Sequence, residues 1–126
     1  KLKDGYDNGG AGLELTARDL AKLGVLWQQQ GRWGSQQVLN QAYVMTSASV
    51  QQPRSRTFAG LSISGYGYGW WLFKQSGQPA GQLAWGYGGQ FVMTIPEQEL
   101  TLLLMANNQT TDVGPQENAV MQLATQ

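Results

Sequence analysis

The chain contains no cysteine and no histidine. Without cysteine it can form no disulfide bond, no thiolate metal site and no thiol nucleophile. Without histidine it lacks the usual general base near neutral pH and the commonest metal ligand. We therefore expect no cofactor and no bound metal ion.

Charged residues are scarce. Eight acidic and eight basic side chains cancel, and no run of like charge occurs. Nucleic-acid binding requires a basic surface to neutralise phosphates, so we expect no nucleic-acid partner. No apolar run reaches the roughly 18 residues that a transmembrane helix requires, and we expect no membrane span.

Glycine and aromatic residues are abundant, with 17 Gly, 5 Trp and 5 Tyr among 126 residues. The most informative stretch is residues 84–96, Ala-Trp-Gly-Tyr-Gly-Gly-Gln-Phe-Val-Met-Thr-Ile-Pro. Gly86, Gly88 and Gly89 carry no Cβ, so a ligand or another backbone can approach them closely. This pattern predicts a strand open along one side; the alternative is a bulged strand in an ordinary sheet.

The first half of the chain carries two helix signals. Thr16 and Asp19 resemble a capping box, and the apolar stripe that follows predicts a helix ending at Gly31. Asn40 is a cap for a short second helix over residues 41–48. Residues 49–64 lack periodicity and are interpreted as an exposed connection.

The second half has strand patterns. Residues 66–73 predict one strand, with Tyr66, Tyr68, Trp70 and Leu72 on one face. A second strand is expected around residues 82–85. Residues 90–95 and 100–106 predict a hairpin with Pro96 in its turn, and Pro115 suits the first turn of a final helix.

These elements predict an α+β fold: an antiparallel sheet of about four strands, flanked by two N-terminal helices and one C-terminal helix. We expect residues 1–126 to form a single domain. Residues 1–15 are a loop entry, 16–64 a helical part, and 65–126 the sheet with the terminal helix.

Four segments in this order resemble the penicillin-recognising serine hydrolases, which comprise class C β-lactamases, DD-peptidases and their esterase and amide-hydrolase relatives. The segments match the family's glycine-rich helix entry, the turn after that helix, its aromatic strand and its active-site strand. They are residues 9–24, 31–40, 66–71 and 85–91. The resemblance implies part of a β-lactamase/transpeptidase-like fold.

Members of this family form an acyl-serine with the serine of a Ser-x-x-Lys motif and use a Tyr-x-Asn or Tyr-x-Ser motif as a second proton carrier. No serine here is followed by lysine three residues later. The resemblance places both motifs upstream of Lys1, so we expect a C-terminal fragment of a larger serine hydrolase, without catalytic residues and inactive alone. Its expected partners are the missing N-terminal part and, in the intact parent, a small acyl substrate. The family also suggests a periplasmic or extracytoplasmic location.

The family's third motif, Lys-Thr-Gly or His-Thr-Gly, matches Tyr87, Gly88 and Gly89. The resemblance therefore makes Trp85, Tyr87, Gly88, Gly89 and Gln90 the substrate-binding strand, with an oxyanion-hole N–H near Gln90. Tyrosine donates a hydrogen bond but cannot supply the positive charge of lysine. This difference favours an ester or amide substrate, or a degenerate homologue.

Two other functions fit the composition. A glycan-binding module would place Tyr66, Tyr68 and Trp70 in one exposed stripe. An interaction domain would leave apolar surface exposed and form a homo-oligomer, through edge strands or swapping. Among the remaining side chains, Trp27 and Trp33 are assigned to packing, and Arg54 and Arg56 to a solvated loop.

Overall fold

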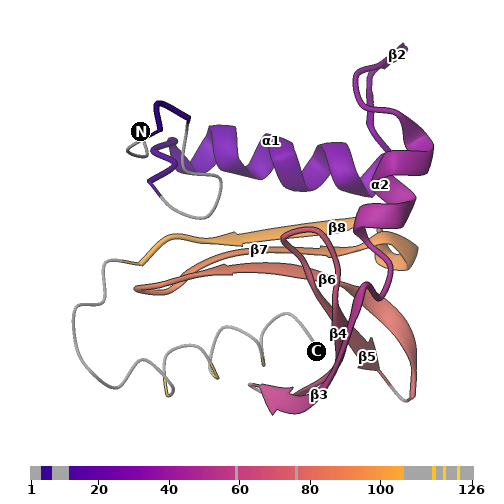
Figure 1. The fold of residues 1–126 in the computed structure, drawn as a ribbon, viewed down its shortest axis with the longest axis vertical. Helices are drawn as coiled ribbons and strands as arrows, with labels where there is room; N and C mark the ends of the chain where they lie inside the picture. Colours follow the sequence, from indigo (N-terminus) through magenta and orange to yellow (C-terminus); the bar gives the residue numbers. More distant parts are fainter. Residues whose placement is uncertain are drawn as a thin grey trace.

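The computed structural model describes residues 4–6, 12–58, 60–75, 77–106, 115, 118 and 122. Their main feature is a six-stranded antiparallel sheet in the order β3-β4-β5-β6-β7-β8, so every strand pairs with its neighbour in sequence. Helix α1 lies along one face of this sheet, over β7 and β8 (Figure 1). The α+β class is confirmed, with six strands in this sheet instead of about four.

Helix α1, Ala17–Gln28, begins where the sequence predicts. The Thr16 hydroxyl accepts a hydrogen bond from the Asp19 N–H at 3.2 Å and donates to the Asp19 carboxylate at 2.7 Å. Gly24 is the buried residue of the helix, and a Cβ there would lie 2.6 Å from Cγ2 of Thr101 and 2.7 Å from Cγ1 of Val92. Glycine therefore allows α1 to lie close to β7 and β8.

A two-stranded hairpin, β1 (Arg32–Trp33) with β2 (Gln36–Gln37), separates α1 from α2 (Gln41–Ser47). Trp27 Nε1 donates to Ser47 Oγ at 2.8 Å, which joins the two helices and confirms that Trp27 packs. Trp33 is 48% exposed on the hairpin, so its assignment to packing is wrong.

Residues 49–64 are not a connection, because they contain most of two strands. These are β3, Gln52–Phe58, and β4, Leu61–Tyr66, so the predicted helical part ends before them. Strand β3 is exposed at almost every position and therefore shows no apolar alternation. Strand β4 buries Leu61 and Ile63, but serines and a glycine fill its other central positions and weaken the pattern.

The predicted strand over residues 66–73 is interrupted by a turn. Strand β4 ends at Tyr66, β5 spans Trp71–Gln75, and the Gly67 N–H donates to the Trp70 carbonyl at 2.8 Å. A Cβ on Gly67 would lie 2.0 Å from the Ser47 carbonyl oxygen. The alternation of glycine with aromatic residues thus belongs partly to a turn packed against α2.

The last three strands follow the predicted order. Strand β6 spans Gln78–Gly86 and starts earlier than expected, and β7 spans Gln90–Ile95. The 3-10 turn η1, Pro96–Gln98, leads into β8, Leu100–Leu104, which confirms the predicted hairpin. Pro115, Asn118 and Gln122 are helical, while the rest of the predicted final helix lies outside the described residues.

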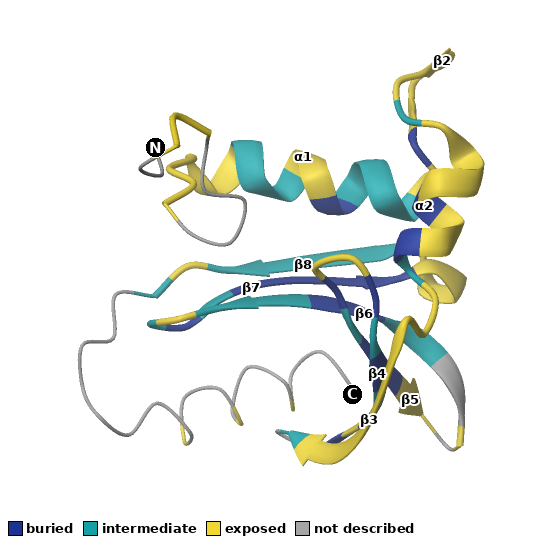
Figure 2. Ribbon diagram, viewed as in Figure 1, coloured by how far each residue is buried: buried dark blue, intermediate teal, exposed yellow. Residues whose placement is uncertain are grey.

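Two clusters of buried apolar side chains lie on the two faces of the sheet. The cluster under α1 contains Trp70, Leu72 and Val92, with Leu20 and Trp27 packed against it. The cluster on the opposite face consists of Leu61, Ile63, Phe73, Leu83, Phe91, Met93 and Ile95. Strand β7 is mostly buried and β3 exposed (Figure 2). In the described part of the chain, no helix is both long and apolar enough to cross a membrane.

Candidate functional site

At the end of β6, one edge of the strand has no other strand beside it among the described residues. Pairing of β6 with β5 ends at Trp71↔Leu83, whereas pairing with β7 continues to Gly86↔Gln90. Among the described residues, 84–86 therefore pair with another strand on one side only. The rest of β6 lies inside the sheet, so it is not an edge strand along its whole length.

Tyr87, Gly88 and Gly89 form the turn between β6 and β7, and not part of a strand as predicted. The φ angles of Gly88 and Gly89 are 84° and 88°, in the left-handed region that favours glycine. A Cβ on Gly89 would also lie 3.1 Å from Cβ of Ala106. Backbone geometry thus accounts for both glycines without a ligand. Tyr87 is 93% exposed at the tip of this turn.

Gly86 differs from these two glycines. A Cβ at this position would meet the nearest Gln90 atom at 3.4 Å, an ordinary van der Waals distance. Its φ is not positive either. Packing within the described chain therefore does not require glycine at the end of the open edge.

The Gln90 side chain holds the turn against the end of β8. Its Nε2 donates to the Ala106 carbonyl at 2.6 Å, and the Ala106 N–H donates to the Gly89 carbonyl at 3.2 Å. The Gln90 carboxamide is thus hydrogen-bonded within the protein. A ligand would therefore contact the backbone of Gln90 and not its side chain.

Trp85 is half-buried in an aromatic cluster. Its ring centroid lies 4.0 Å from that of Phe58 and 6.1 Å from that of Phe91, both in stacked arrangements. The Arg56 guanidinium lies 5.3 Å from the centroids of both Trp85 and Trp71. Arg54 and Arg56 are therefore exposed as expected but lie on strand β3, so their assignment to a loop is corrected; no alternation in the sequence around them indicated a strand.

The aromatic residues near the β4–β5 turn do not form the stripe that the glycan-binding alternative requires. Tyr66 is half-buried with an edge-on contact to Trp71, Tyr68 is 50% exposed, and Trp70 is 6% exposed under α1. The chain thus lacks the specific feature by which this alternative would be recognised.

One tripeptide with the spacing of a family motif does occur in the chain. Residues 6–8 read Tyr-Asp-Asn, which corrects the expectation that every Tyr-x-Asn tripeptide lies upstream of Lys1. Tyr6 is 74% exposed, its N–H donates to Asp4 Oδ1, and its side chain makes no hydrogen bond or ring contact with a described residue. The spacing alone assigns no role to Tyr6.

The antiparallel sheet with a helix on one face agrees with the α+β class that was expected, although Tyr87, Gly88 and Gly89 lie in a turn and not in the strand that the resemblance implies. The family model described as Beta-lactamase matches residues 1–126. The chain therefore belongs to the beta-lactamase family and is related to its serine hydrolases. No curated protein and no solved structure matches the chain.

Proposed function

We propose that this chain is the C-terminal part of an acyl-serine hydrolase and forms one wall of its active site. The serine nucleophile and its lysine base belong, in this proposal, to a part of the protein that precedes Lys1. Export to the periplasm or cell surface, suggested by the family resemblance, belongs to the same proposal.

The open edge of β6 supports the proposal most directly. An extended acyl substrate can lie beside Ala84 and Gly86, where β6 no longer pairs with β5, and form backbone hydrogen bonds there, as in strand addition. Gly86 supports this role, because its lack of a side chain leaves the edge accessible and nothing in the described packing requires it.

The turn after β6 supplies the polar groups. In the serine hydrolases a developing oxyanion is stabilised by backbone N–H groups, and we assign one of them to the backbone near Gln90. The bond from the Gln90 side chain to Ala106 fixes this backbone in position before the substrate arrives.

Tyr87 indicates the substrate class. It occupies the position of the family's lysine or histidine, and its phenol donates a hydrogen bond but never carries a positive charge. A substrate carboxylate would thus have no cation at this position. We propose a neutral ester or amide as substrate, in preference to a β-lactam or a carboxylate-bearing peptide.

Labelling with a fluorophosphonate, which reacts with activated serines, tests the proposal. The longer protein should be labelled at a Ser-x-x-Lys serine upstream of Lys1, as located by mass spectrometry of its peptides. The 126-residue chain should stay unlabelled and should not hydrolyse p-nitrophenyl acetate. Labelling of a serine within residues 1–126 would contradict the assignment.

The chain without its N-terminal part is also proposed to self-associate. Strand β8 pairs with β7 on one side, and among the described residues no strand pairs with its other edge. Leu100, Leu102, Leu103 and Leu104 make this edge apolar, and such edges add further strands. Sedimentation equilibrium should show a dimer that Leu102→Lys weakens; a monomer at high concentration would contradict self-association.

A further inference from the structure

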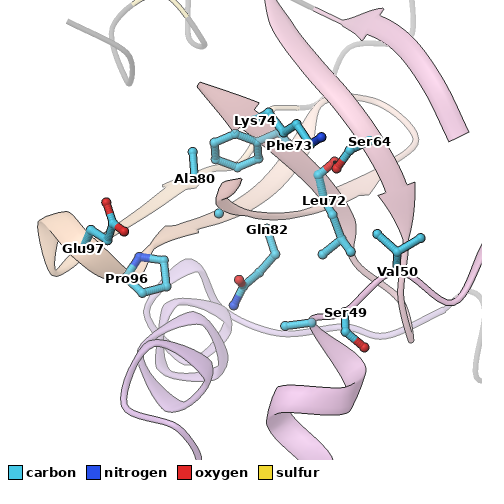
Figure 3. A pocket seen from close by; sticks show the side chains of 12 residues that line it. Ser49, Val50, Ser64, Leu72, Phe73, Lys74, Ala80, Gln82, Pro96 and Glu97 are labelled. Atoms are coloured by element: carbon cyan, nitrogen blue, oxygen red, sulfur yellow. The ribbon is translucent and has the colours of Figure 1, made fainter. Parts of the chain in front are cut away.

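A cavity lies beside β6, away from the open edge of that strand. It has a volume of about 510 Å³, within the range of small-molecule sites. The end of α2, strands β4 to β6 and the turn η1 surround it (Figure 3). Its apolar walls are formed by Ala48, Val50, Leu72, Phe73, Ala80 and Pro96.

Gln82 projects from β6 into this cavity (Figure 3). The residue is 6% exposed, and its carboxamide has no hydrogen-bond partner among the described residues. Buried polar groups are almost always hydrogen-bonded, since an unpaired buried amide lowers stability. A carboxamide offers both a donor and an acceptor, and it therefore matches another amide group.

Thr94 is the neighbour of Gln82 on β7 and does not line the cavity. It pairs directly with Gln82, so the two side chains lie on the same face of the sheet. Thr94 is completely buried, and its Oγ1 also lacks a partner. Its Cγ2 faces α1, 3.5 Å from a Cβ placed on Gly24, so the unpaired polar group at the cavity is that of Gln82.

Opposite charges lie at two sides of the cavity. Lys74 comes from β5 and Glu97 from η1, and Figure 3 shows them on different sides of Gln82. Both residues are exposed, and neither forms an ion pair with a described residue. This arrangement suits a molecule with one anionic end, one cationic end and an uncharged middle.

We propose that this cavity binds a short apolar peptide with free termini. Its peptide group pairs with the Gln82 carboxamide, its carboxylate faces Lys74, and its ammonium group faces Glu97. Gln82 lies four residues before Gly86, roughly 13 Å along the strand at about 3.3 Å per residue. The site is thus separate from the proposed acyl site and does not depend on the hydrolase proposal.

Titration of the ¹³C,¹⁵N-labelled chain with the dipeptide Leu-Ala tests the site. We expect the side-chain NH₂ signals of Gln82 and the methyl signals of Leu72 and Val50 to shift saturably. N-acetyl-Leu-Ala-amide, which has no charged ends, should bind several-fold more weakly. Signals of Gln82 that do not move with millimolar dipeptide, or that move with protein concentration alone because a second copy fills the cavity, would overturn the proposal.

Substitutions separate a ligand site from a structural glutamine. Gln82→Leu should weaken dipeptide binding about tenfold, while the same change at exposed Gln75 leaves it unchanged. Gln82→Leu should also keep or raise the melting temperature, because it replaces an amide that has no partner among the described residues with an apolar side chain. If the variant fails to fold, Lys74→Met and Glu97→Gln, both at exposed positions, should each weaken binding. Unchanged affinity in the folded variants would contradict the proposal.

Discussion

The ring of Phe58 stacks on that of Trp85 with 4.0 Å between centroids, although β4 and β5 separate their strands. Phe58 is the last residue of β3, next to the turn that leads into β4. This end of the β3–β4 hairpin therefore lies over the sheet face opposite α1. Arg56 covers the same rings, with its guanidinium 5.3 Å from the Trp85 centroid. This contact joins the exposed end of the sheet to the strand that carries the candidate site.

We expect Phe58→Ala to lower the free energy of unfolding by about 2–3 kcal/mol, because it removes the buried part of the ring and its stacking on Trp85. Urea denaturation monitored by Trp fluorescence measures this. Tyr68→Ala is the matched control, since Tyr68 is half exposed and its nearest ring, that of Tyr43, is 6.3 Å away. An equal loss of unfolding free energy in both variants would show that the Phe58–Trp85 stack does not stabilise the fold more than an exposed aromatic ring does.

Local signals in the sequence were enough for some elements and not for others. The caps at Thr16 and Asn40 and the proline in the β7–β8 turn act on neighbouring residues, so the sequence predicts α1, α2 and this hairpin correctly. Strand β3 depends on pairing with β4 and on aromatic contacts distant in sequence. Nothing local distinguishes such a strand from a loop.

Gly24→Ala should destabilise the chain even though alanine favours a helix by about 1 kcal/mol. The new Cβ would lie under 3 Å from Thr101 and Val92, so α1 has to move away from the sheet. We expect a net loss of about 1–3 kcal/mol in urea denaturation. Arg18→Ala, at an exposed position of the same helix, should change stability by less than about 0.5 kcal/mol. A gain in stability for Gly24→Ala would mean that the helix–sheet contact is looser than described.

The candidate site was located from sequence only in part. The glycines of residues 86–89 indicated the right segment, but a turn and a ligand-binding strand favour glycine for different reasons. The φ angles assign Gly88 and Gly89 to the turn and leave Gly86 as the position that backbone geometry does not explain. Gln82 gave no sequence signal, because glutamine in a strand is ordinarily a surface residue.

The Asp19 carboxylate should titrate below its usual range. The hydrogen bond from Lys22 lowers the pKa of Asp19, and the hydrogen bond from Thr16 lowers it further. The ionised Asp19 carboxylate therefore contributes fully to stability above about pH 4, the pKa of aspartate in the unfolded chain. This contribution is lost as the pH falls through the lower pKa of Asp19 in the folded chain. An NMR pH titration should show the low pKa, and Lys22→Met should raise it. An unchanged Asp19 pKa in this variant would show that Lys22 is not the main cause.

Gly86→Ala and Gly89→Ala form a matched pair that separates turn geometry from substrate access. Gly89→Ala should lower stability by about 1–2 kcal/mol, since alanine is strained at a φ of 88° and contacts Ala106. Gly86→Ala should change stability by less than about 0.5 kcal/mol, because its Cβ meets ordinary contacts.

In the longer protein, Gly86→Ala should reduce activity more than Gly89→Ala does, which is the opposite of their order of effect on stability. A methyl group on Gly86 would stand on the backbone beside which the substrate is proposed to lie, and it should reduce kcat/KM at least tenfold while the fold stays intact. Hydrolysis of p-nitrophenyl acetate and thermal unfolding, measured on the same preparations, give both quantities. Full activity in a stable Gly86→Ala protein would show that the substrate does not approach this edge, since no folding defect could then hide the effect.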